Sequence, residues 1–318
     1  MRRVALFILL LSLSRLAAAA DFCLRVASYN VENFFDATHD SLHSDYDFLP
    51  DGQYYWNETR YRRKAQQIAR VVAILGGEDK AAVVGLSEVE NASCLRLLCR
   101  CLSNLHYRFL HFEGPDRRGI DVALLYDPLL FYPVDSAALT VPLGRESTRD
   151  ILYAAGRLPT GDTLHIYQCH LPSMRGGKQA SDWKRRAAKQ VIRHHADSIL
   201  SIHPDALLLV MGDMNSSPED DLPGLTNRMI PLAEQGEGTH RYRGIWNCLD
   251  QMYLSPALDK VSDVRILRHS LLLEEDPRYL DATPNRTFHG LHYNPYGFSD
   301  HLPIYLDLCL PLPLPHLL

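Results

Sequence analysis

The spacing of apolar stretches along the chain is the feature that most limits what it can fold into. Ten stretches of strand length are alternating or continuously apolar, and many follow one another with no helical pattern between them. A doubly wound fold, in which each strand leads into a helix, does not have this order. The predicted strands cover Leu24–Val31, Ala81–Val89, Tyr107–Phe112, Ile120–Tyr126, Ile151–Leu158, Thr163–His170, Leu207–Gly212, Leu249–Leu254, Val261–Leu267 and Leu302–Leu308.

Three segments have the periodicity of helices: Glu58–Leu75, Ala92–Asn104 and Ser181–Leu200, the last with Ser181 as its N-cap. The predicted apolar faces are Tyr61, Ala65, Ile68, Val72 and Leu75 in the first helix, and Trp183, Ala187, Val191 and Ile199 in the last. Strands therefore outnumber helices, which predicts an α/β fold of two packed sheets with helices outside. No linker or repeat divides the chain, so we expect one domain over residues 21–309 and an irregular tail over residues 310–318.

The first 20 residues have the pattern of a secretory signal peptide. Arg2 and Arg3 precede the apolar run Val4–Leu13, and the alanines Ala18–Ala20 form a cleavage site before Asp21. The alternative is an uncleaved anchor helix, which Arg15 disfavours by interrupting the apolar run. We expect a secreted or periplasmic protein with no membrane span in the mature chain.

Cleavage would remove the three arginines of this segment and change the formal net charge from −5 to −8. A net acidic protein has no general attraction to nucleic acid or to anionic membranes. This does not exclude a nuclease, because a local basic groove or a bound metal cation can supply the attraction.

All seven cysteines lie beyond the predicted signal peptide, where an oxidising compartment would permit disulfides. Seven is odd, so at least one cysteine stays free or pairs between chains. Cys94, Cys99 and Cys101 are close in sequence, but their spacing fits no common zinc pattern. We therefore expect them to be buried or in disulfides.

Polar residues that could do chemistry stand at the ends of the predicted strands, where sheet proteins gather functional groups. They are Asn30, Glu88, His170, Asp213, Asn215, Asp250, Asp300 and His301. Each of these residues also has an ordinary structural interpretation when it is taken singly. Asn30 would be a turn residue, Glu88 a solvent-exposed residue, and His170 a side chain bonded to nearby backbone.

The most specific pattern is Asp213 and Asn215 in LLLVMGDMNSSPED. Gly212 permits a tight turn, and residues i and i+2 of extended backbone point to the same side. A carboxylate and an amide placed together can orient a water molecule and a phosphate oxygen. The alternative is an Asx-turn, which the strongly apolar preceding strand makes less favoured.

Together these residues offer carboxylates for a hard cation and two histidines for phosphoryl charge. The carboxylates are too few for an all-protein calcium cage, whereas Mg²⁺ needs one or two carboxylates and keeps its waters. The set suits metal-assisted attack of water on a phosphate ester. If Asp250 contacts His301, it would fix the histidine tautomer and stabilise the imidazolium.

The ordered motifs S-Y-N-V, S-E-V-E, C-H-L-P, G-D-M-N-S-S-P, L-D-Q-M and S-D-H-L-P resemble the endonuclease/exonuclease/phosphatase superfamily. The resemblance spans Leu24 to Asp307 and implies a four-layer α/β sandwich, two mixed sheets flanked by helices. It also implies Mg²⁺ as the cofactor, with Mn²⁺ and Ca²⁺ as alternatives. Two departures are Met214, where phenylalanine is usual, and Cys248, where arginine or serine is frequent.

The resemblance also implies roles for single residues. Glu88 would be the principal metal ligand, Asp300 a second one, and Asn30 the amide that arranges metal-bound groups. In the catalytic set, Asp213 would position or deprotonate the water, Asn215 would bind phosphate, His301 backed by Asp250 would contact the scissile phosphate, and His170 would be a second active-site histidine.

Arginines near these motifs are candidates for substrate binding. Arg117 and Arg118 precede the strand G-I-D-V-A-L-L-Y, and Arg175 follows His170 in a glycine-containing loop. The alternative is a solvent-exposed loop. Asp121 in the following strand is predicted to orient an arginine.

Taken together, the sequence predicts a secreted Mg²⁺-dependent phosphodiesterase, with a nuclease acting on DNA or RNA favoured. Nucleic acid would be its substrate, with no stable protein partner and a monomeric state. The alternatives are a phosphatase or a sphingomyelinase-like lipid enzyme on the same fold, and a binding module that lacks catalysis. A lipid enzyme would need exposed aromatic residues, for which Phe48, Tyr54, Tyr55 and Trp56 are the candidates.

Overall fold

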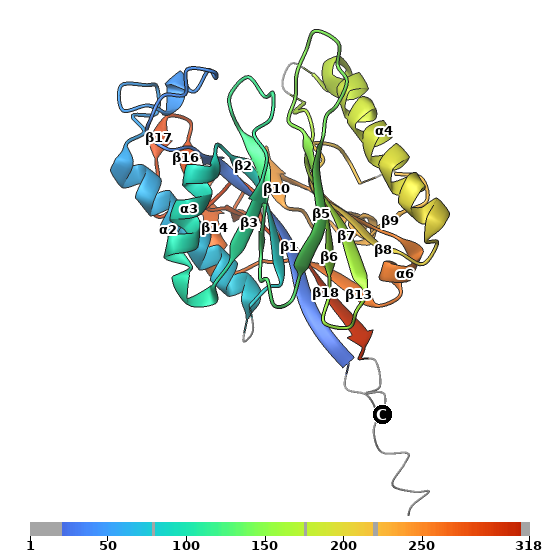
Figure 1. Cartoon of the computed structure of the whole chain (residues 1–318). Coiled ribbons are helices and arrows are strands. Elements are labelled where there is room, and N and C mark those ends of the chain that lie inside the picture. Colours follow the sequence, from blue (N-terminus) through green and yellow to red (C-terminus); the bar gives the residue numbers. More distant parts are fainter. Residues whose placement is uncertain (1–20, 78–79, 175–176, 219–221, 313–318) are drawn as a thin grey trace, which may run out of the picture.

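In the computed structural model, which describes residues 21–77, 80–174, 177–218 and 222–312, two six-stranded sheets pack face to face (Figure 1). Helices cover the outer face of each sheet, so the molecule has the predicted four-layer α/β architecture. Each sheet is antiparallel apart from one parallel pair, which is β1 with β2 in the first sheet and β7 with β8 in the second.

The first sheet has the strand order β13-β18-β1-β2-β4-β3. Its strands are β1 (Asp21–Phe34), β2 (Val83–Val89), β3 (Arg108–His111), β4 (Asp121–Tyr126), β13 (Ser262–Ile266) and β18 (Ile304–Pro311). The second sheet has the order β5-β6-β7-β8-β12-β9. Its strands are β5 (Tyr132–Leu139), β6 (Ile151–Arg157), β7 (Thr163–His170), β8 (Leu207–Asp213), β9 (Thr226–Asn227) and β12 (Asp250–Leu254).

The helices are α2 (Glu58–Gly76), α3 (Ala92–Cys101), α4 (Lys178–Ile202), α5 (Ile230–Glu234) and α6 (Pro256–Asp259), with 3₁₀ turns at Tyr46–Phe48, Ser103–Leu105 and Ser270–Leu272. Asn57 and Asn91 cap α2 and α3, because each side chain accepts two backbone N–H bonds of the first turn. Among the described residues, no helix is long and apolar enough to cross a membrane.

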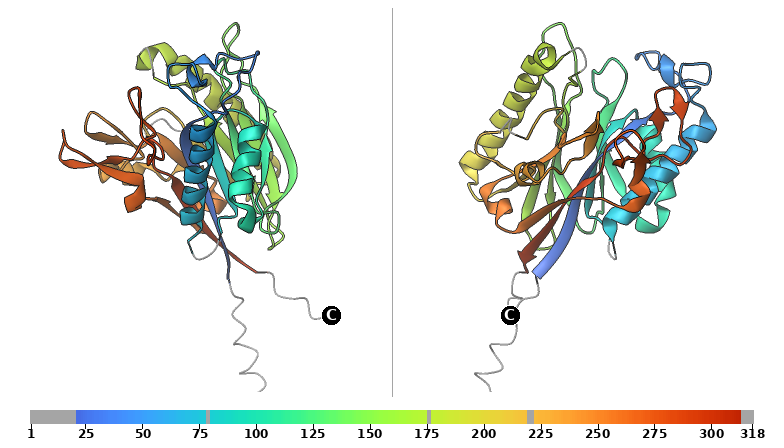
Figure 2. Two further views of the ribbon diagram at one scale, coloured as in Figure 1. Left: turned by 90° about the vertical axis from the view of Figure 1, so that its left-hand side faces the viewer. Right: turned by 180° about the vertical axis from the view of Figure 1, so that it is seen from behind.

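Three small hairpins lie outside the sheets: β10 (His240–Tyr242) with β11 (Ile245–Asn247), β14 (Leu273–Asp276) with β15 (Asp281–Pro284), and β16 (Phe288–His289) with β17 (His292–Tyr293). They belong to the orange and red segment that projects from the body of the molecule in Figure 2. The sequence did not predict them because their strands have only two to four residues.

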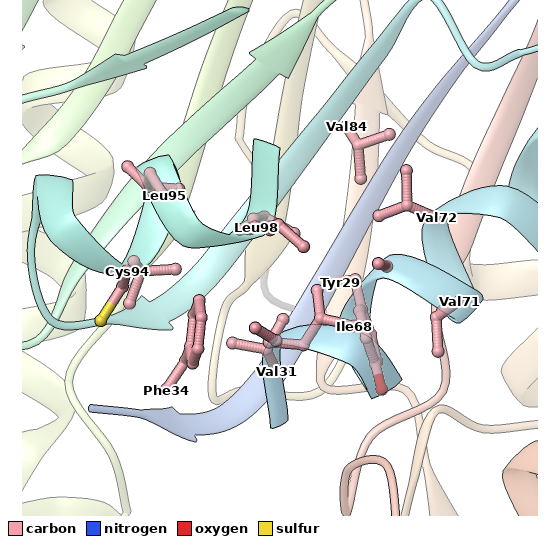
Figure 3. Close-up of a cluster of buried hydrophobic side chains, with 14 of the residues drawn as sticks. Tyr29, Val31, Phe34, Ile68, Val71, Val72, Val84, Cys94, Leu95 and Leu98 are labelled. Carbon is pink, nitrogen blue, oxygen red and sulfur yellow. The ribbon is translucent and has the colours of Figure 1, made fainter. Parts of the chain in front are cut away.

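Strand periodicity builds three apolar layers. In β8, Leu207, Leu209 and Met211 face the first sheet, whereas Leu208 and Val210 face α4. A third cluster fills the space between the first sheet and helices α2 and α3, where Tyr29, Val31 and Val84 meet Ile68, Val72 and Leu98 (Figure 3). Alternate residues of a buried strand thus hold two layers together.

Helix α2 buries the face that the sequence predicts, and α4 does so in part, because Ala187, Val191 and Ile199 are partly buried against the second sheet. Trp183 is exposed, and the residues of α4 that are fully buried against the second sheet are Ala188, Ile192 and Ala196. Ser181 is not the N-cap, since α4 begins at Lys178 and the Ser181 hydroxyl accepts a hydrogen bond from the buried Arg185. Arg185 is therefore bonded within the helix and to the carbonyl of Pro172.

The two ends of the domain lie side by side. Strands β1 and β18 pair antiparallel from Asp21 with Pro311 to Ser28 with Ile304, and a disulfide joins Cys23 to Cys309. Strand β18 therefore includes two residues of the segment predicted to be irregular. The other five cysteines are free, and of the Cys94, Cys99 and Cys101 group only Cys94 is fully buried.

Candidate active site

The eight predicted polar side chains come from one rim of the sandwich. His170 and Asp213 end β7 and β8, Glu88 is the last residue but one of β2, Asn30 lies toward the end of β1, and Asp250 begins β12. Asn215 follows β8, and Asp300 and His301 precede β18. Because the parallel strands of both sheets run to this rim, residues that are far apart in sequence meet there.

Strand register sets the centre of the group. Asp213 is the neighbour of His170 on β7 and of Asp250 on β12, so the three form a row across the second sheet. The Asp213 Oδ2 atom lies 3.6 Å from His170 Nε2 and 3.9 Å from His301 Nε2, and it accepts a hydrogen bond from Asn30 Nδ2 at 3.0 Å. The Asp213 carboxylate therefore lies between two imidazoles and an amide.

Close approach of β7 and β8 depends on Gly212, which has a φ of 133°. A Cβ atom at this position would lie 2.0 Å from the carbonyl oxygen of Cys169 on the neighbouring strand. Gly212 lies within β8 and not in a turn, so the predicted tight turn is wrong. The glycine is required instead by strand packing directly below Asp213.

Glu88 lies in a distorted part of β2. Its φ is 67°, in the left-handed region, and the pairing of β2 with β4 shifts register between Ser87 and Val89. One Glu88 oxygen accepts from Asn30 Nδ2 at 3.3 Å and the other from the backbone N–H of Asn33 at 2.9 Å. Local backbone strain thus holds a carboxylate at the rim, as is frequent at functional sites.

His301 is held in a charged form by its neighbours. Its Nδ1 lies 2.7 Å from Asp250 Oδ2, and both side chains are buried. Burial disfavours the charge, but the carboxylates of Asp250, Asp213 and Asp300 outweigh it and raise the pKa of His301 well above its usual value. Burial raises the pKa of Asp213 to about 7, with the His301 charge opposing the rise.

His170 is held in the opposite state. Burial, together with the charges of Arg149, Arg118 and His301, lowers its pKa well below the usual value. A neutral imidazole and an imidazolium therefore face the same Asp213 carboxylate. Such a pair of groups with opposite protonation states can supply one acceptor and one donor at neutral pH.

Asn215 follows the Asp213 strand in a left-handed conformation with a φ of 47°. Its backbone N–H donates to Asp213 Oδ1 at 2.9 Å, which is the Asx-turn that the sequence made the less favoured alternative. Its Nδ2 donates to the carbonyl of Leu171 at 3.0 Å. The structure therefore brings Asn215 to the site and also gives it a role in holding the segment after β7.

The three predicted substrate-binding arginines have different positions. Arg118 is half-exposed, its Nε lies 3.8 Å from an Asp116 oxygen, and its charge acts on His170. Arg117 is exposed, and its carbonyl accepts from the backbone of Ser44. Arg175 lies outside the described residues.

A buried arginine that sequence reasoning missed lies between these groups. Arg149 donates to the carbonyls of His170 at 2.9 Å and Leu171 at 3.1 Å, and it pairs with Asp116 at 2.9 Å. In sequence it stands in the polar stretch R-E-S-T-R-D, which is indistinguishable from a surface loop. The carboxylate that pairs with the buried Arg149 is thus Asp116. Asp121, which was predicted to orient an arginine, lies next to His111 instead.

His240 is a second missed residue. It forms an isolated β-bridge with His301, and the two rings lie 4.9 Å apart between centroids. Burial and the His301 charge lower its pKa to about 4, so it is neutral. Burial opposes ionisation of Asp300, but the His301 and Arg286 charges outweigh burial and lower the pKa of that carboxyl.

The residues fit a hard divalent cation of the kind that the predicted cofactor, Mg²⁺, represents. Glu88 and Asp300 are oxygen donors whose side chains are 16% and 28% exposed, so each is anchored yet open to solvent. Among the described residues, the sets of three close ligand atoms do not include Glu88. Mg²⁺ does not need three protein ligands close together, because it binds one or two carboxylates and retains water ligands.

Known structures share this fold at low sequence identity. Truncated TDP2 from Caenorhabditis elegans is 17% identical with a TM-score of 0.58, and the match covers 90% of this chain and 97% of that one. The human Nocturnin catalytic domain with bound sulfate is 16% identical with a TM-score of 0.56, covering 91% and 95%.

D. rerio TDP2 complexed with single strand DNA product is 18% identical with a TM-score of 0.56, covering 90% and 99%. No curated protein matches the sequence. The profile of the Endonuclease/Exonuclease/phosphatase family, however, matches residues 25–309, nearly the whole described domain. The chain belongs to this family of metal-dependent phosphoric ester hydrolases.

Proposed function

We propose that this protein is a secreted, Mg²⁺-dependent endonuclease that hydrolyses DNA or RNA. The observation that carries the catalytic part is the Asp213 carboxylate between a neutral His170 and a charged His301. Bound Mg²⁺ at Glu88 and Asp300 would stabilise phosphoryl charge and make a water molecule more acidic.

The chain's own groups divide the remaining work. Asp213, with a pKa near neutral, would accept the proton of the attacking water. His301, charged and fixed by Asp250, would donate a hydrogen bond to a phosphoryl oxygen as negative charge develops there. Arg118, which is open to solvent next to this group, would bind a phosphate of the substrate.

A surface next to the site supports nucleic acid as the substrate. It is formed by Tyr242, Arg243 and Ile245 of the β10–β11 hairpin and by Arg278, Tyr279 and Leu280 of the β14–β15 hairpin, and is called here the hairpin surface. The hairpins are joined because Arg241 donates to the carbonyl of Ala282 at 2.7 Å. Arg243 lies over the Tyr242 ring, and Arg241 and Arg278 lie over the Tyr279 ring.

The hairpin surface begins two residues from the site, because His240 bridges His301 and Tyr242 follows on the same strand. Tyr242, Ile245, Tyr279 and Leu280 are exposed. Aromatic rings that stack bases, interleaved with arginines that bind phosphates, are a common means of holding a nucleic-acid strand without sequence preference. This arrangement favours a polynucleotide over a small phosphate ester.

The first long loop gives less support to a lipid substrate. Phe48 and Trp56 are buried, and Tyr54 stacks on Phe48, so most of the candidate membrane-binding aromatic residues pack inward. Tyr55 alone among these four is exposed. These four residues therefore do not form the exposed apolar tip that insertion into a bilayer needs.

Secretion is supported by two observations. The first 20 residues have the pattern of a signal peptide with a cleavage site before Asp21, and the Cys23–Cys309 disulfide is typical of proteins in oxidising compartments. The test is to express the full-length chain and to determine the N-terminus of the resulting protein by mass spectrometry. We expect a mature N-terminus at Asp21 in the medium or periplasm; an intact Met1 N-terminus in the cytosol contradicts the proposal.

The activity test offers the chain from Asp21 onward four substrates in parallel: plasmid DNA, RNA, bis-p-nitrophenyl phosphate and p-nitrophenyl phosphate. Each reaction is run with Mg²⁺ and with chelator, and with the Asp213→Ala and Glu88→Gln variants. We expect internal nicking of nucleic acid that chelator and both variants abolish. Turnover confined to the small esters would move the substrate to lipid or sugar phosphates.

A further inference from the structure

A second group of potential metal ligands lies in the β3–β4 hairpin, outside the catalytic residues. It consists of His111 at the end of β3, Glu113 in the connecting loop and Asp121 at the start of β4, and is called here the β3–β4 cluster. One ligand atom from each residue lies within 4.8 Å of the other two. The hairpin brings them together because residues 111 and 121 end and begin adjacent strands.

The His111 ring is the unusual member of the β3–β4 cluster. Its side chain is 3% exposed, yet its Nε2 atom has no hydrogen-bond partner. Buried polar atoms in proteins nearly always have one. The Asp121 Oδ2 atom is 3.5 Å away but does not meet hydrogen-bond geometry with Nε2. The Nε2 atom is thus aimed into the cluster without a partner there.

This spacing is the one expected of two ligands that share a cation. Two bonds of about 2.0–2.1 Å at a tetrahedral angle place their donor atoms roughly 3.3 Å apart. A direct hydrogen bond between the same groups would be about 2.8 Å long. The separation of 3.5 Å between Nε2 and Oδ2 is close to the first value.

The surroundings hold the Asp121 carboxylate in place. The backbone N–H of Gly114 donates to Asp121 Oδ2 at 3.2 Å. A Cβ atom on Gly114 would lie 2.5 Å from Asp121 Oδ1, so the loop closes tightly around this carboxylate. Glu113 remains 58% exposed, with an oxygen 3.7 Å from His111 Nδ1. The cluster therefore has two buried donors and one donor at the solvent side.

We propose that the β3–β4 cluster is a second metal site, for a divalent transition metal such as Zn²⁺. His111 Nε2, Asp121 and Glu113 would supply three ligands, and water would complete a tetrahedral set. One imidazole with two carboxylates selects a transition metal over Mg²⁺ and Ca²⁺, which prefer oxygen donors alone. The site shares no residue with the catalytic group.

The loop that the metal would fix gives the site its role. Residues 112–120 connect the ligands and carry Asp116, Arg117 and Arg118. Asp116 pairs with Arg149, which holds the carbonyl of His170. A cation at the base of this loop would restrain the arginines that face the substrate; this consequence, unlike the site itself, rests on the proposed function.

The test measures Zn²⁺ binding by calorimetry and equilibrium dialysis, using the folded domain with Glu88→Gln to weaken the catalytic cation site. We expect that adding Glu113→Gln lowers the number of tightly bound Zn²⁺ ions by one or weakens one ion at least tenfold. Because Glu113 is exposed, this change leaves the fold intact. Adding His111→Ala should have the same effect, and His292→Ala, at an exposed histidine, should have none.

Unchanged Zn²⁺ binding in the Glu113→Gln and His111→Ala variants would overturn the proposal and leave the cluster as an ion pair between a histidine and two carboxylates. A Zn²⁺-dependent rise in Tm that Glu113→Gln removes provides a second readout. Neither measurement uses catalytic activity, so the result is independent of whether the protein proves to be a nuclease.

Discussion

Asp250 and His301 form a buried pair in which a carboxylate oxygen lies 2.7 Å from the imidazole Nδ1. The two residues are 51 positions apart and come from the start of β12 and the loop before β18. The contact leaves Nε2 directed toward Asp213 and Asp300, at 3.9 and 4.0 Å. Asp250 thereby sets both the tautomer and the charge of the histidine.

Replacing Asp250 by asparagine should test this relationship directly. We expect kcat to fall by about 10²- to 10⁴-fold, the range that one positioned acid–base group contributes. The His301 pKa should also fall, because the carboxylate that raises it most is lost. NMR titration of the His301 imidazole checks the pKa. A variant with normal kcat, or with an unchanged His301 pKa, would show that Asp250 does not act on the reaction through His301.

The activity should depend on pH through Asp213. Its carboxyl has a pKa of about 7 and must be ionised to accept a proton, so log kcat/KM should fall with unit slope as pH drops below about 7. The His301 charge, with its raised pKa, persists through neutral pH and is lost only as pH rises further. A profile of kcat/KM against pH, measured with bis-p-nitrophenyl phosphate, provides the check.

Ionisation of Asp213 should also change the stability of the protein, but in the opposite direction: activity rises with pH, whereas the free energy of unfolding falls. A carboxyl whose folded pKa is raised from 3.8 to about 7 binds its proton more tightly in the folded state. Its contribution to the free energy of unfolding is therefore lost as pH rises through 7. Asp213→Asn should remove this loss and be more stable than wild type at pH 8 in urea unfolding. A loss of stability on raising the pH through 7 that persists in Asp213→Asn would assign that loss to another group.

Arg149 should be essential for positioning His170. Arg149→Met would leave Asp116 without its buried partner, and breaking such a pair costs about 3–5 kcal/mol of stability. Arg149→Lys keeps the charge but cannot contact two carbonyls and a carboxylate together, so we expect a folded protein with reduced kcat. Urea unfolding and kcat measure the two effects. Arg145→Met, an exposed arginine of the same segment, is the control and should be neutral.

Strand and helix content could be predicted because burial imposes a period on the sequence. The ten predicted strands all occur, and the five residues of α2 that were predicted to face inward are all buried. In α4, Ala187, Val191 and Ile199 are partly buried as predicted, but the fully buried Ala188 and Ile192 lie one position further along. Its Ala187 and Ala188 give the apolar period two settings, and only packing on the second sheet selects the one with Trp183 exposed.

The site could be predicted in part, because carboxylates and histidines stand directly after apolar strands. Asp213 and His170 are neighbours through strand register, which follows once both strands are placed. Arg149 and His240 could not be found in this way. They come from loops and short hairpins whose positions depend on tertiary contacts, and their sequence is that of ordinary polar surface.

The hairpin surface should contribute to binding of polynucleotides but not of small esters. Tyr242→Ala with Tyr279→Ala should raise KM for single-stranded DNA or RNA at least tenfold, since stacking contributes about 1–3 kcal/mol per base. The kinetics with bis-p-nitrophenyl phosphate should not change. Tyr132→Ala, at an exposed tyrosine of the edge strand β5, is the control. Equal losses on both substrates would point to damage at the site instead.

The Cys23–Cys309 disulfide should stabilise the whole domain, because it joins its first and last strands across 286 positions. Closing so long a loop restricts the unfolded chain strongly, and loss of a native disulfide typically costs about 2–5 kcal/mol. Cys23→Ser and Cys309→Ser should each lower the free energy of unfolding by this amount, as should reduction of the wild-type protein, and the double variant should add nothing further. Guanidinium unfolding with and without reductant measures these effects. Cys101→Ser, at a free and partly exposed cysteine, is the matched control and should unfold like wild type in both conditions. If reductant destabilises the double variant as much as wild type, the stabilising bond lies elsewhere among the cysteines.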